Sequence, residues 1–315
     1  MAHDFPARGP CRPDGRAVGI LRRCIVGLAA AALLAAPAFA QTDDHTFTTS
    51  DGVRLHYLEA GDEHAHTIVF IPGWTMPAWI FEAQIAALSR DYRVVALDPR
   101  GQGQSDIPDQ GYDQDRRGQD IAELIDRLGP DPVVVAGWSL GVLDTLAYVA
   151  RSGDSHVAGL ILVDNSIGEE PAPGASPPTS QPPSKASPNG PRRSATCTRA
   201  FVAGMFARPR SADYIDRLAA DCGRTPAFAA RALLAYPVPR SYWRNAVYST
   251  DKPVFYIVRP RWEPQAQNLL RNRPNAESLL FPSAGHALFV DEPERFNAAV
   301  SDFLGRRVWP SPPAP

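Results

Sequence analysis

The chain has 315 residues, of which 44% are hydrophobic, and its formal net charge is -2 at pH 7. This length suits one sizeable domain, and the apolar fraction is typical of a folded globule. A charge so close to zero gives no electrostatic reason to expect a nucleic-acid partner.

The N-terminus has the features of a signal peptide. Arg22 and Arg23 precede an apolar run, Ile25 to Ala36, and small residues lead to a cleavage position after Ala40. The run is shorter than the ~20 apolar residues that span a bilayer, so we expect no stable membrane anchor. We therefore expect residues 1–40 to be removed and the protein to be exported, either to the periplasm or into the medium.

Two cysteines remain after this cleavage, Cys197 and Cys222. In an oxidising compartment they can form one disulfide, or they can stay as two buried, unpaired thiols. The sequence leaves both alternatives open, because it does not show how far apart the two residues lie.

Residues 41–168 alternate short β-rich runs with amphipathic stretches, the pattern of a mostly parallel sheet flanked by helices. The turn signal at Asp51-Gly52 predicts that the sheet opens with an antiparallel hairpin. The predicted strands are Thr46–Thr49, Val53–Glu59, Thr67–Ile71, Arg93–Leu97, Val133–Ala136 and Leu160–Val163. The predicted helices are Ala78–Ser89, Asp115–Leu128 and Leu140–Arg151.

The composition changes at Glu169, where a proline-rich stretch from Pro171 to Pro191 predicts a loop without regular structure. A helical, aromatic-rich pattern follows, and we interpret residues 169–250 as this loop and a helical cap inserted between two strands. Residues 251–305 form the second part of the core, and residues 306–315 form a tail. The core elements predicted there are strands Pro253–Val258 and Ser278–Phe281 and helices Pro264–Arg271 and Pro293–Leu304.

A candidate nucleophile stands in the sequence Gly137-Trp138-Ser139-Leu140-Gly141, between a predicted strand and a predicted helix. The flanking glycines permit a strained turn that lifts Ser139 above the edge of the sheet. The start of the helix behind the serine favours developing negative charge.

A serine nucleophile needs a base within hydrogen-bond reach, and ligands gather at the C-terminal ends of parallel strands. Of the histidines after residue 40, only His286 follows the last predicted strand. The other five lie in the opening hairpin, in the turn before the third strand or at the N-terminal entry to a strand: His45, His56, His64, His66 and His156. His64 and His66 lack the carboxylate or cysteine company of a metal site, and we expect no metal or organic cofactor.

Four separated motifs resemble those of the α/β-hydrolase superfamily over nearly the whole chain after residue 40. Besides the serine motif, they are Phe70–Trp74, Asp98–Ser105 and Gly285-His286 with the following Asp291–Phe296. The resemblance implies an α/β-hydrolase fold with an inserted helical cap, a mostly parallel sheet flanked by helices. Pro72 departs from the pattern, since many members have histidine at this position.

Site residues are also implied by the resemblance. Ser139 is the expected nucleophile, His286 the base, and the backbone N–H groups of Trp74 and Leu140 the oxyanion hole. Two residues are candidates for the acid that orients His286. Glu263 lies at about the usual distance after the strand that precedes the histidine strand, and it is favoured. Asp164, at the end of the sixth strand, is the alternative, a placement that some relatives use.

The function implied by the resemblance is that of a serine hydrolase, which cleaves carboxylic esters of small or medium size through an acyl-enzyme. Lactone or amide hydrolysis and cofactor-free perhydrolysis would use the same residues, and a non-catalytic ligand-binding protein is the rival from another class. Aromatic residues of the cap favour an apolar pocket for a small-molecule substrate. The sequence leaves the natural substrate and the oligomeric state open.

Overall fold

The computed structural model describes residues 42–169 and 195–310. The predicted signal peptide, residues 1–40, and the predicted proline-rich loop, Pro171–Pro191, lie outside the described residues. Within the two described ranges no helix is long and apolar enough to cross a membrane.

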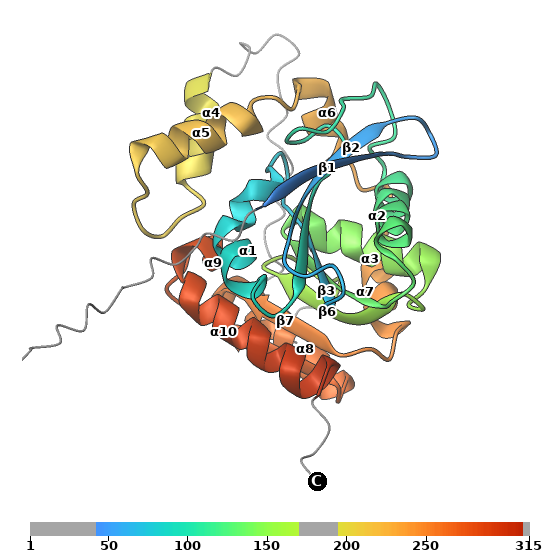
Figure 1. Ribbon diagram of the computed structural model, residues 1–315. Coiled ribbons are helices and arrows are strands. Elements are labelled where there is room, and N and C mark those ends of the chain that lie inside the picture. The colour runs from blue at the N-terminus through green and yellow to red at the C-terminus, as the bar shows by residue number, and fades with distance from the viewer. Residues whose placement is uncertain (1–41, 170–194, 311–315) are drawn as a thin grey trace, which may run out of the picture. The chain divides into compact units, whose positions relative to one another are not determined.

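Eight strands form a single sheet in the order β1-β2-β4-β3-β5-β6-β7-β8, which confirms the predicted fold class (Figure 1). Strand β2 pairs antiparallel with β1 and β4, and all other neighbours pair parallel. The opening hairpin follows from Gly52, whose φ of 83° suits the turn. The strands are β1 Asp43–Thr48, β2 Arg54–Ala60, β3 Thr67–Ile71, β4 Arg93–Asp98, β5 Val133–Trp138, β6 Val157–Val163, β7 Val254–Val258 and β8 Ala276–Leu280.

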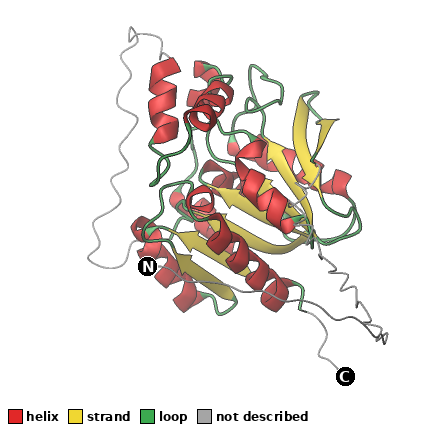
Figure 2. Ribbon diagram, turned by 60° about the vertical axis from the view of Figure 1, so that its left-hand side comes forward, coloured by secondary structure: helices red, strands yellow, loops and turns green. Residues whose placement is uncertain are grey.

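Helices cover both faces of the sheet, as Figure 2 shows. One buried cluster joins the sheet to α2 (Gln114–Leu128), α3 (Leu140–Ser152), α7 (Arg240–Tyr248) and α8 (Glu263–Asn272). A second cluster on the opposite face joins it to α1 (Glu82–Leu88), α9 (Leu288–Asp291) and α10 (Pro293–Phe303). The central strands are therefore buried on both sides, which explains their continuous runs of apolar residues.

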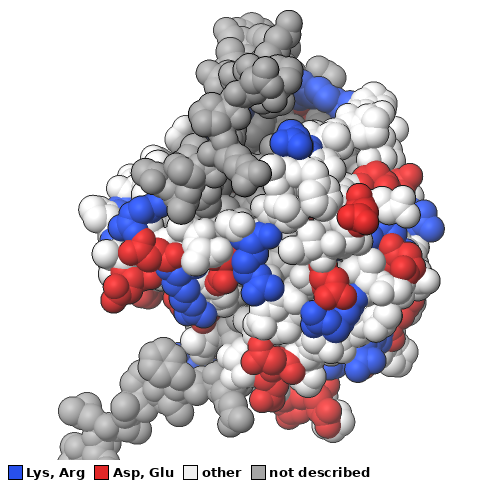
Figure 3. Space-filling view, turned by 90° about the horizontal axis from the view of Figure 1, so that it is seen from above, with Lys and Arg blue, Asp and Glu red and all other residues white. Residues whose placement is uncertain are grey.

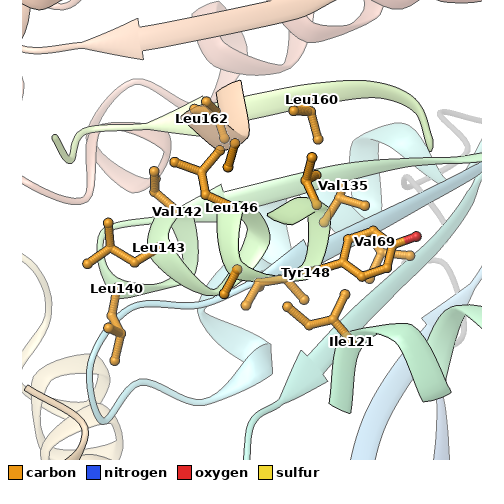
Figure 4. Close-up of a cluster of buried hydrophobic side chains, with 14 of the residues drawn as sticks. Val69, Ile121, Val135, Leu140, Val142, Leu143, Leu146, Tyr148, Leu160 and Leu162 are labelled. Carbon is orange, nitrogen blue, oxygen red and sulfur yellow. The ribbon is translucent and has the colours of Figure 1, made fainter. Parts of the chain in front are cut away.

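Helix α3 begins within the serine motif, directly after Ser139, and packs on the sheet through its apolar face. Figure 4 shows Leu146 of α3 next to Leu162 of β6, and Val135 of β5 belongs to the same buried cluster. Leu146 and Leu162 are fully buried. Burying a leucine contributes roughly 1.5–3 kcal/mol, so this contact fixes the helix, and with it the residue that precedes the helix.

Three helices between β6 and β7 form what we call the cap: α4 (Ala195–Ala203), α5 (Ala212–Cys222) and α6 (Ala227–Ala232). Hydrogen bonds join the cap to the core, among them Thr225 Oγ1 to Gly101 O at 2.7 Å and Trp79 Nε1 to Asp221 Oδ2 at 2.7 Å. The predicted cap extended to residue 250, but α7 packs on α3 and belongs to the layer that covers the sheet.

The shorter helical elements are η1 (Ala78–Phe81), η2 (Pro260–Trp262) and the π-helix η3 (Leu304–Val308). Part of the segment predicted as a tail is therefore structured. Trp309, beyond η3, stacks on His66 with ring centroids 4.4 Å apart. On the face seen in Figure 3, acidic and basic residues are interspersed.

Candidate active site

Ser139 stands on a sharp turn between β5 and α3, with φ 54° and ψ -118°. A non-glycine residue in this region costs of order 1–3 kcal/mol, and such strain is typical of functional sites. The two glycines of the motif are required by close packing. A Cβ on Gly137 would collide with the carbonyl of Gly141, and a Cβ on Gly141 would collide with the carbonyl of Ile71.

His286 lies in the loop between β8 and α9, and its ring bridges two other predicted site residues. Its Nε2 is 2.8 Å from Ser139 Oγ, and its Nδ1 is 2.6 Å from Asp164 Oδ2. Nδ1 donates its proton to the carboxylate, which leaves Nε2 free to accept the serine proton. The three side chains thus have the connectivity of an acid, a base and a nucleophile.

Asp164 occupies the position beside His286 that the sequence favoured for Glu263. Asp164 directly follows β6, has φ 51°, and has a fully buried side chain. The preference for Glu263 is corrected by this geometry. Glu263 is the first residue of α8, and its Oε1 accepts a hydrogen bond from Gln267 Nε2 at 3.4 Å, so it supports its own helix rather than the imidazole.

Arg259, which sequence reasoning missed, completes the surroundings of Asp164. Its backbone N–H donates to Asp164 Oδ1 at 3.1 Å and its Nε to Oδ2 at 2.6 Å. Its Nη2 lies 3.4 Å from Nδ1 of His286. The buried carboxylate is therefore paired with a cation and hydrogen-bonded on both oxygens, as a buried charge requires.

The predicted oxyanion residues lie on either side of Ser139. Leu140 is the first residue of α3, where a backbone N–H has no acceptor within the helix. Gly73, which precedes Trp74, is so close that a Cβ on it would lie 3.0 Å from Ser139 Cβ. The Trp74 indole donates to Ala230 O of the cap at 2.7 Å, which links this loop to α6.

Two further residues that the sequence did not single out hold the site together. Asn165 Nδ2 donates to Ser139 O at 2.7 Å. Trp138 Nε1 donates to His286 O at 2.9 Å, and the Trp138 and His286 ring centroids are 5.2 Å apart. Trp138 belongs to the serine motif, but its hydrogen bond to His286 joins residues 148 positions apart and is therefore not visible in the sequence.

The remaining histidines lie away from this site. His56 bridges two carboxylates, with Nδ1 2.8 Å from Asp98 Oδ2 and Nε2 2.9 Å from Asp44 Oδ1. Burial by itself lowers the pKa of His56, but the hydrogen bonds to the two aspartates raise it above its usual value. In the part of the chain that the structure describes, no three histidine, cysteine, aspartate or glutamate residues are grouped to hold a metal.

The structure carries Cys222 as a free, buried thiol, whose Sγ is 3.0 Å from Thr75 Oγ1. The side chain of Cys197 lies outside the described residues. Of the two alternatives that the sequence left open, the structure of Cys222 matches the unpaired thiol.

The larger of two described cavities has a volume of about 790 Å³ and lies apart from the catalytic geometry. Residues of the opening hairpin, η1, α1 and the cap line it, including His56, Trp79 and Arg217. Ser139 and His286 are not among its lining residues. The candidate site is therefore the group of hydrogen-bonded side chains around His286 and not this cavity, because a reaction requires reactive groups within hydrogen-bond distance of one another.

Known proteins resemble this chain in sequence and structure. A model described as the alpha/beta hydrolase family matches residues 68–299. A non-heme chloroperoxidase of Streptomyces lividans is 39% identical over 119 residues, 38% of this chain and 43% of that protein. A bifunctional esterase/perhydrolase of Acinetobacter calcoaceticus is 36% identical over 117 residues, 37% of this chain and 42% of that protein. The chain thus matches less than half the length of these two relatives.

A crystal structure of a Burkholderia cenocepacia protein assigned as an aryl esterase superposes with a TM-score of 0.69 and 26% identity. The superposition covers 83% of this chain and 98% of that one. The likeness therefore extends over most of both chains.

Proposed function

This chain belongs to the α/β-hydrolase family, and from that premise we propose that it is a serine hydrolase. Its proposed substrates are carboxylic esters of small or medium size, cleaved through an acyl-enzyme. The observation that carries the proposal is the pair of contacts made by His286, 2.8 Å to Ser139 Oγ and 2.6 Å to Asp164 Oδ2.

In the proposed mechanism Ser139 Oγ attacks the substrate carbonyl while His286 Nε2 takes the serine proton. Asp164 holds Nδ1–H and stabilises the imidazolium that forms. The backbone N–H groups of Trp74 and Leu140 stabilise the oxyanion, an effect worth roughly 3–4 kcal/mol per donor in such sites. His286 then protonates the leaving alcohol, and water cleaves the acyl-enzyme with His286 again as base. No cofactor or metal takes part in these steps.

The relatives support ester chemistry. The Acinetobacter calcoaceticus relative is named an esterase as well as a perhydrolase, and the Burkholderia cenocepacia neighbour is assigned as an aryl esterase. A serine at the turn also favours acyl transfer, because it forms an ester intermediate that a water molecule can cleave.

The test combines labelling and turnover. A fluorophosphonate probe should label the wild type, and the Ser139→Ala variant should stay unlabelled. A panel of p-nitrophenyl esters of increasing chain length should show hydrolysis by the wild type that Ser139→Ala reduces by at least ~10³-fold. An unlabelled wild type, or equal turnover by the two proteins, would overturn the proposal.

A second candidate is perhydrolysis, favoured by the Acinetobacter calcoaceticus relative, which is named a bifunctional esterase/perhydrolase. Hydrogen peroxide would replace water as the acceptor, so that the acyl-enzyme yields a peroxycarboxylic acid and free Ser139. Incubation with acetate ester and peroxide, followed by measurement of peracetic acid, tests it. Release of acetate alone at high peroxide concentration would exclude this activity.

We also propose that the chain is exported and loses residues 1–40. Support comes from the basic residues and the short apolar run that precede Ala40. Mass spectrometry of protein recovered from an expressing cell should find Gln41 as the first residue. An intact N-terminus in protein from the periplasm and the medium would contradict cleavage.

A further inference from the structure

The loop that carries His286 is bonded to the cap as well as to the sheet. Ala287 N donates to Met205 O at 3.1 Å, and Met205 belongs to the segment between α4 and α5. Figure 1 shows this segment reaching down from the cap toward α9. The backbone on one side of the histidine is thus paired with cap backbone.

Asp291, the last residue of α9, accepts hydrogen bonds from both the histidine loop and the segment between α4 and α5. Its Oδ2 accepts from Gly285 N at 2.7 Å and from Ala207 N at 2.8 Å. Its Oδ1 accepts from Arg210 Nη2 at 2.9 Å. The Asp291 side chain is 1% exposed, so three donors compensate a buried carboxylate, and such charge-assisted bonds are about twice as strong as neutral ones.

The histidine loop and the segment between α4 and α5 are also in tight van der Waals contact. A Cβ on Gly285 would collide with Met205 O and come within 2.6 Å of Ala207 N. Glycine is therefore required next to His286 by the approach of the cap segment. Met205 itself is buried at 4% exposure, which anchors this segment in the second core cluster.

We infer that Asp291 is a positioning residue for His286, because it locks the histidine loop to the cap segment Met205–Arg210. This inference rests on the proposed function of His286 as the base. Asp291 touches no reacting atom. It acts by fixing the backbone of Gly285, and so the distance from His286 Nε2 to Ser139 Oγ. A displacement of about 1 Å in a catalytic group can cost about 10²-fold in rate.

The experiment compares Asp291→Asn and Arg210→Met with the matched pair Asp302→Asn and Arg306→Met. The control pair is an exposed ion pair on the C-terminal helices, with Asp302 Oδ2 2.6 Å from Arg306 Nη2. For each protein, kcat and KM for a p-nitrophenyl ester and the rate of fluorophosphonate labelling are measured well below the melting temperature.

Asp291→Asn should lower kcat and the labelling rate in parallel by about 10-fold or more, with KM changed by less than about twofold. Arg210→Met, which leaves both backbone contacts of Asp291 in place, should lower kcat by about two- to threefold. The two control variants should match the wild type. A lower melting temperature of Asp291→Asn with unchanged kcat and labelling would show a purely structural role and overturn the inference.

Gly285→Ala keeps the inference testable if Asp291→Asn fails to fold. It should lower kcat at least as much, because the added methyl group separates the histidine loop from the cap segment. Unchanged kcat in both Gly285→Ala and Arg210→Met would overturn the inference. A wild type that neither hydrolyses esters nor accepts the probe would overturn the proposed function itself, and so the two failures are distinguishable.

Discussion

Arg259 Nε lies 2.6 Å from Asp164 Oδ2, the same oxygen that accepts from His286 Nδ1. Arg259 is the first residue after β7, close to where the family resemblance placed the acid. A cation therefore stands in the region where a carboxylate was expected, and its partner comes from the end of the neighbouring strand β6. The two ends adjoin because β6 and β7 pair in parallel, with Val163 opposite Ile257.

This relationship predicts which carboxylate matters. Asp164→Asn should lower kcat by up to about 10⁴-fold, because an amide does not hold the imidazole in the tautomer that accepts the serine proton. Glu263→Gln is the matched comparison and should stay within about twofold of the wild type. Steady-state kinetics with a p-nitrophenyl ester, on variants with native circular dichroism, measures both. A larger loss of kcat in Glu263→Gln than in Asp164→Asn would identify Glu263, the first residue of α8, as the acid.

Gly73→Ala should damage the oxyanion hole. The added Cβ would lie 3.0 Å from Ser139 Cβ and 3.2 Å from the Trp138 ring, so the loop that carries Trp74 must move away. Loss of one oxyanion donor costs about 10²–10³-fold in kcat. Gly305→Ala is the control, since a Cβ there meets nothing within 4 Å. Equal kcat values for Gly73→Ala and Gly305→Ala would count against the predicted position of the oxyanion hole.

Trp138→Phe should weaken catalysis mildly. The change keeps a ring beside the imidazole but removes the N–H that donates to His286 O at 2.9 Å. One hydrogen bond contributes about 1 kcal/mol, which corresponds to about fivefold in kcat. Trp309→Phe, at the far end of the chain, should leave kcat unchanged. If the two phenylalanine variants have the same kcat, the indole contact does not position the base.

His56 should make stability depend on pH. Although burial lowers its pKa, the bonds to Asp98 and Asp44 raise it above the usual 6.5, so the native state binds this proton more tightly than the unfolded state. Its contribution is fully present below pH 6.5 and is lost as pH rises through the raised pKa. The melting temperature of the wild type should therefore fall over this range.

The variant His56→Gln lacks this proton, and its melting temperature should fall less over the same range. His64→Gln, whose side chain is 86% exposed in the wild type, is the control and should follow the wild-type curve. Parallel curves for wild type and His56→Gln would show that the bridge between the two aspartates adds no pH-dependent stability.

The strands and the serine turn were predictable because they depend on local patterns. Val133–Trp138 is an apolar run bounded by a glycine motif, and the predicted start of α3 at Leu140 agrees with the structure. Such runs are long enough to signal burial on both faces. Their ends differed from the predicted ends by a few residues, as for β6, which begins at Val157 and not at Leu160.

The acid was not predictable from spacing alone. Counting residues from the strand led to Glu263, but Pro260–Trp262 turns as a short 3-10 helix and makes Glu263 the first residue of α8. Asp164 adopts a positive φ at the end of β6, and no sequence pattern predicts this conformation for an aspartate. The contacts of Asp291 with Ala207 and Arg210 join residues about 80 positions apart, and they appear only when the cap is in place.

The parallel pairing of β6 and β7 also governs what happens if the chain is cut. Ser139 and Asp164 precede residues 170–194, and His286 follows them, so a break in that interval divides the three side chains of the proposed mechanism between two polypeptides. The parallel pairing of β6 with β7, in which Leu160 lies opposite Val254 and Val163 opposite Ile257, would then join the two fragments. Neither half could react with a fluorophosphonate alone, and the reassembled pair could. The fold therefore offers a natural site for a split enzyme whose activity reports on the meeting of its two parts.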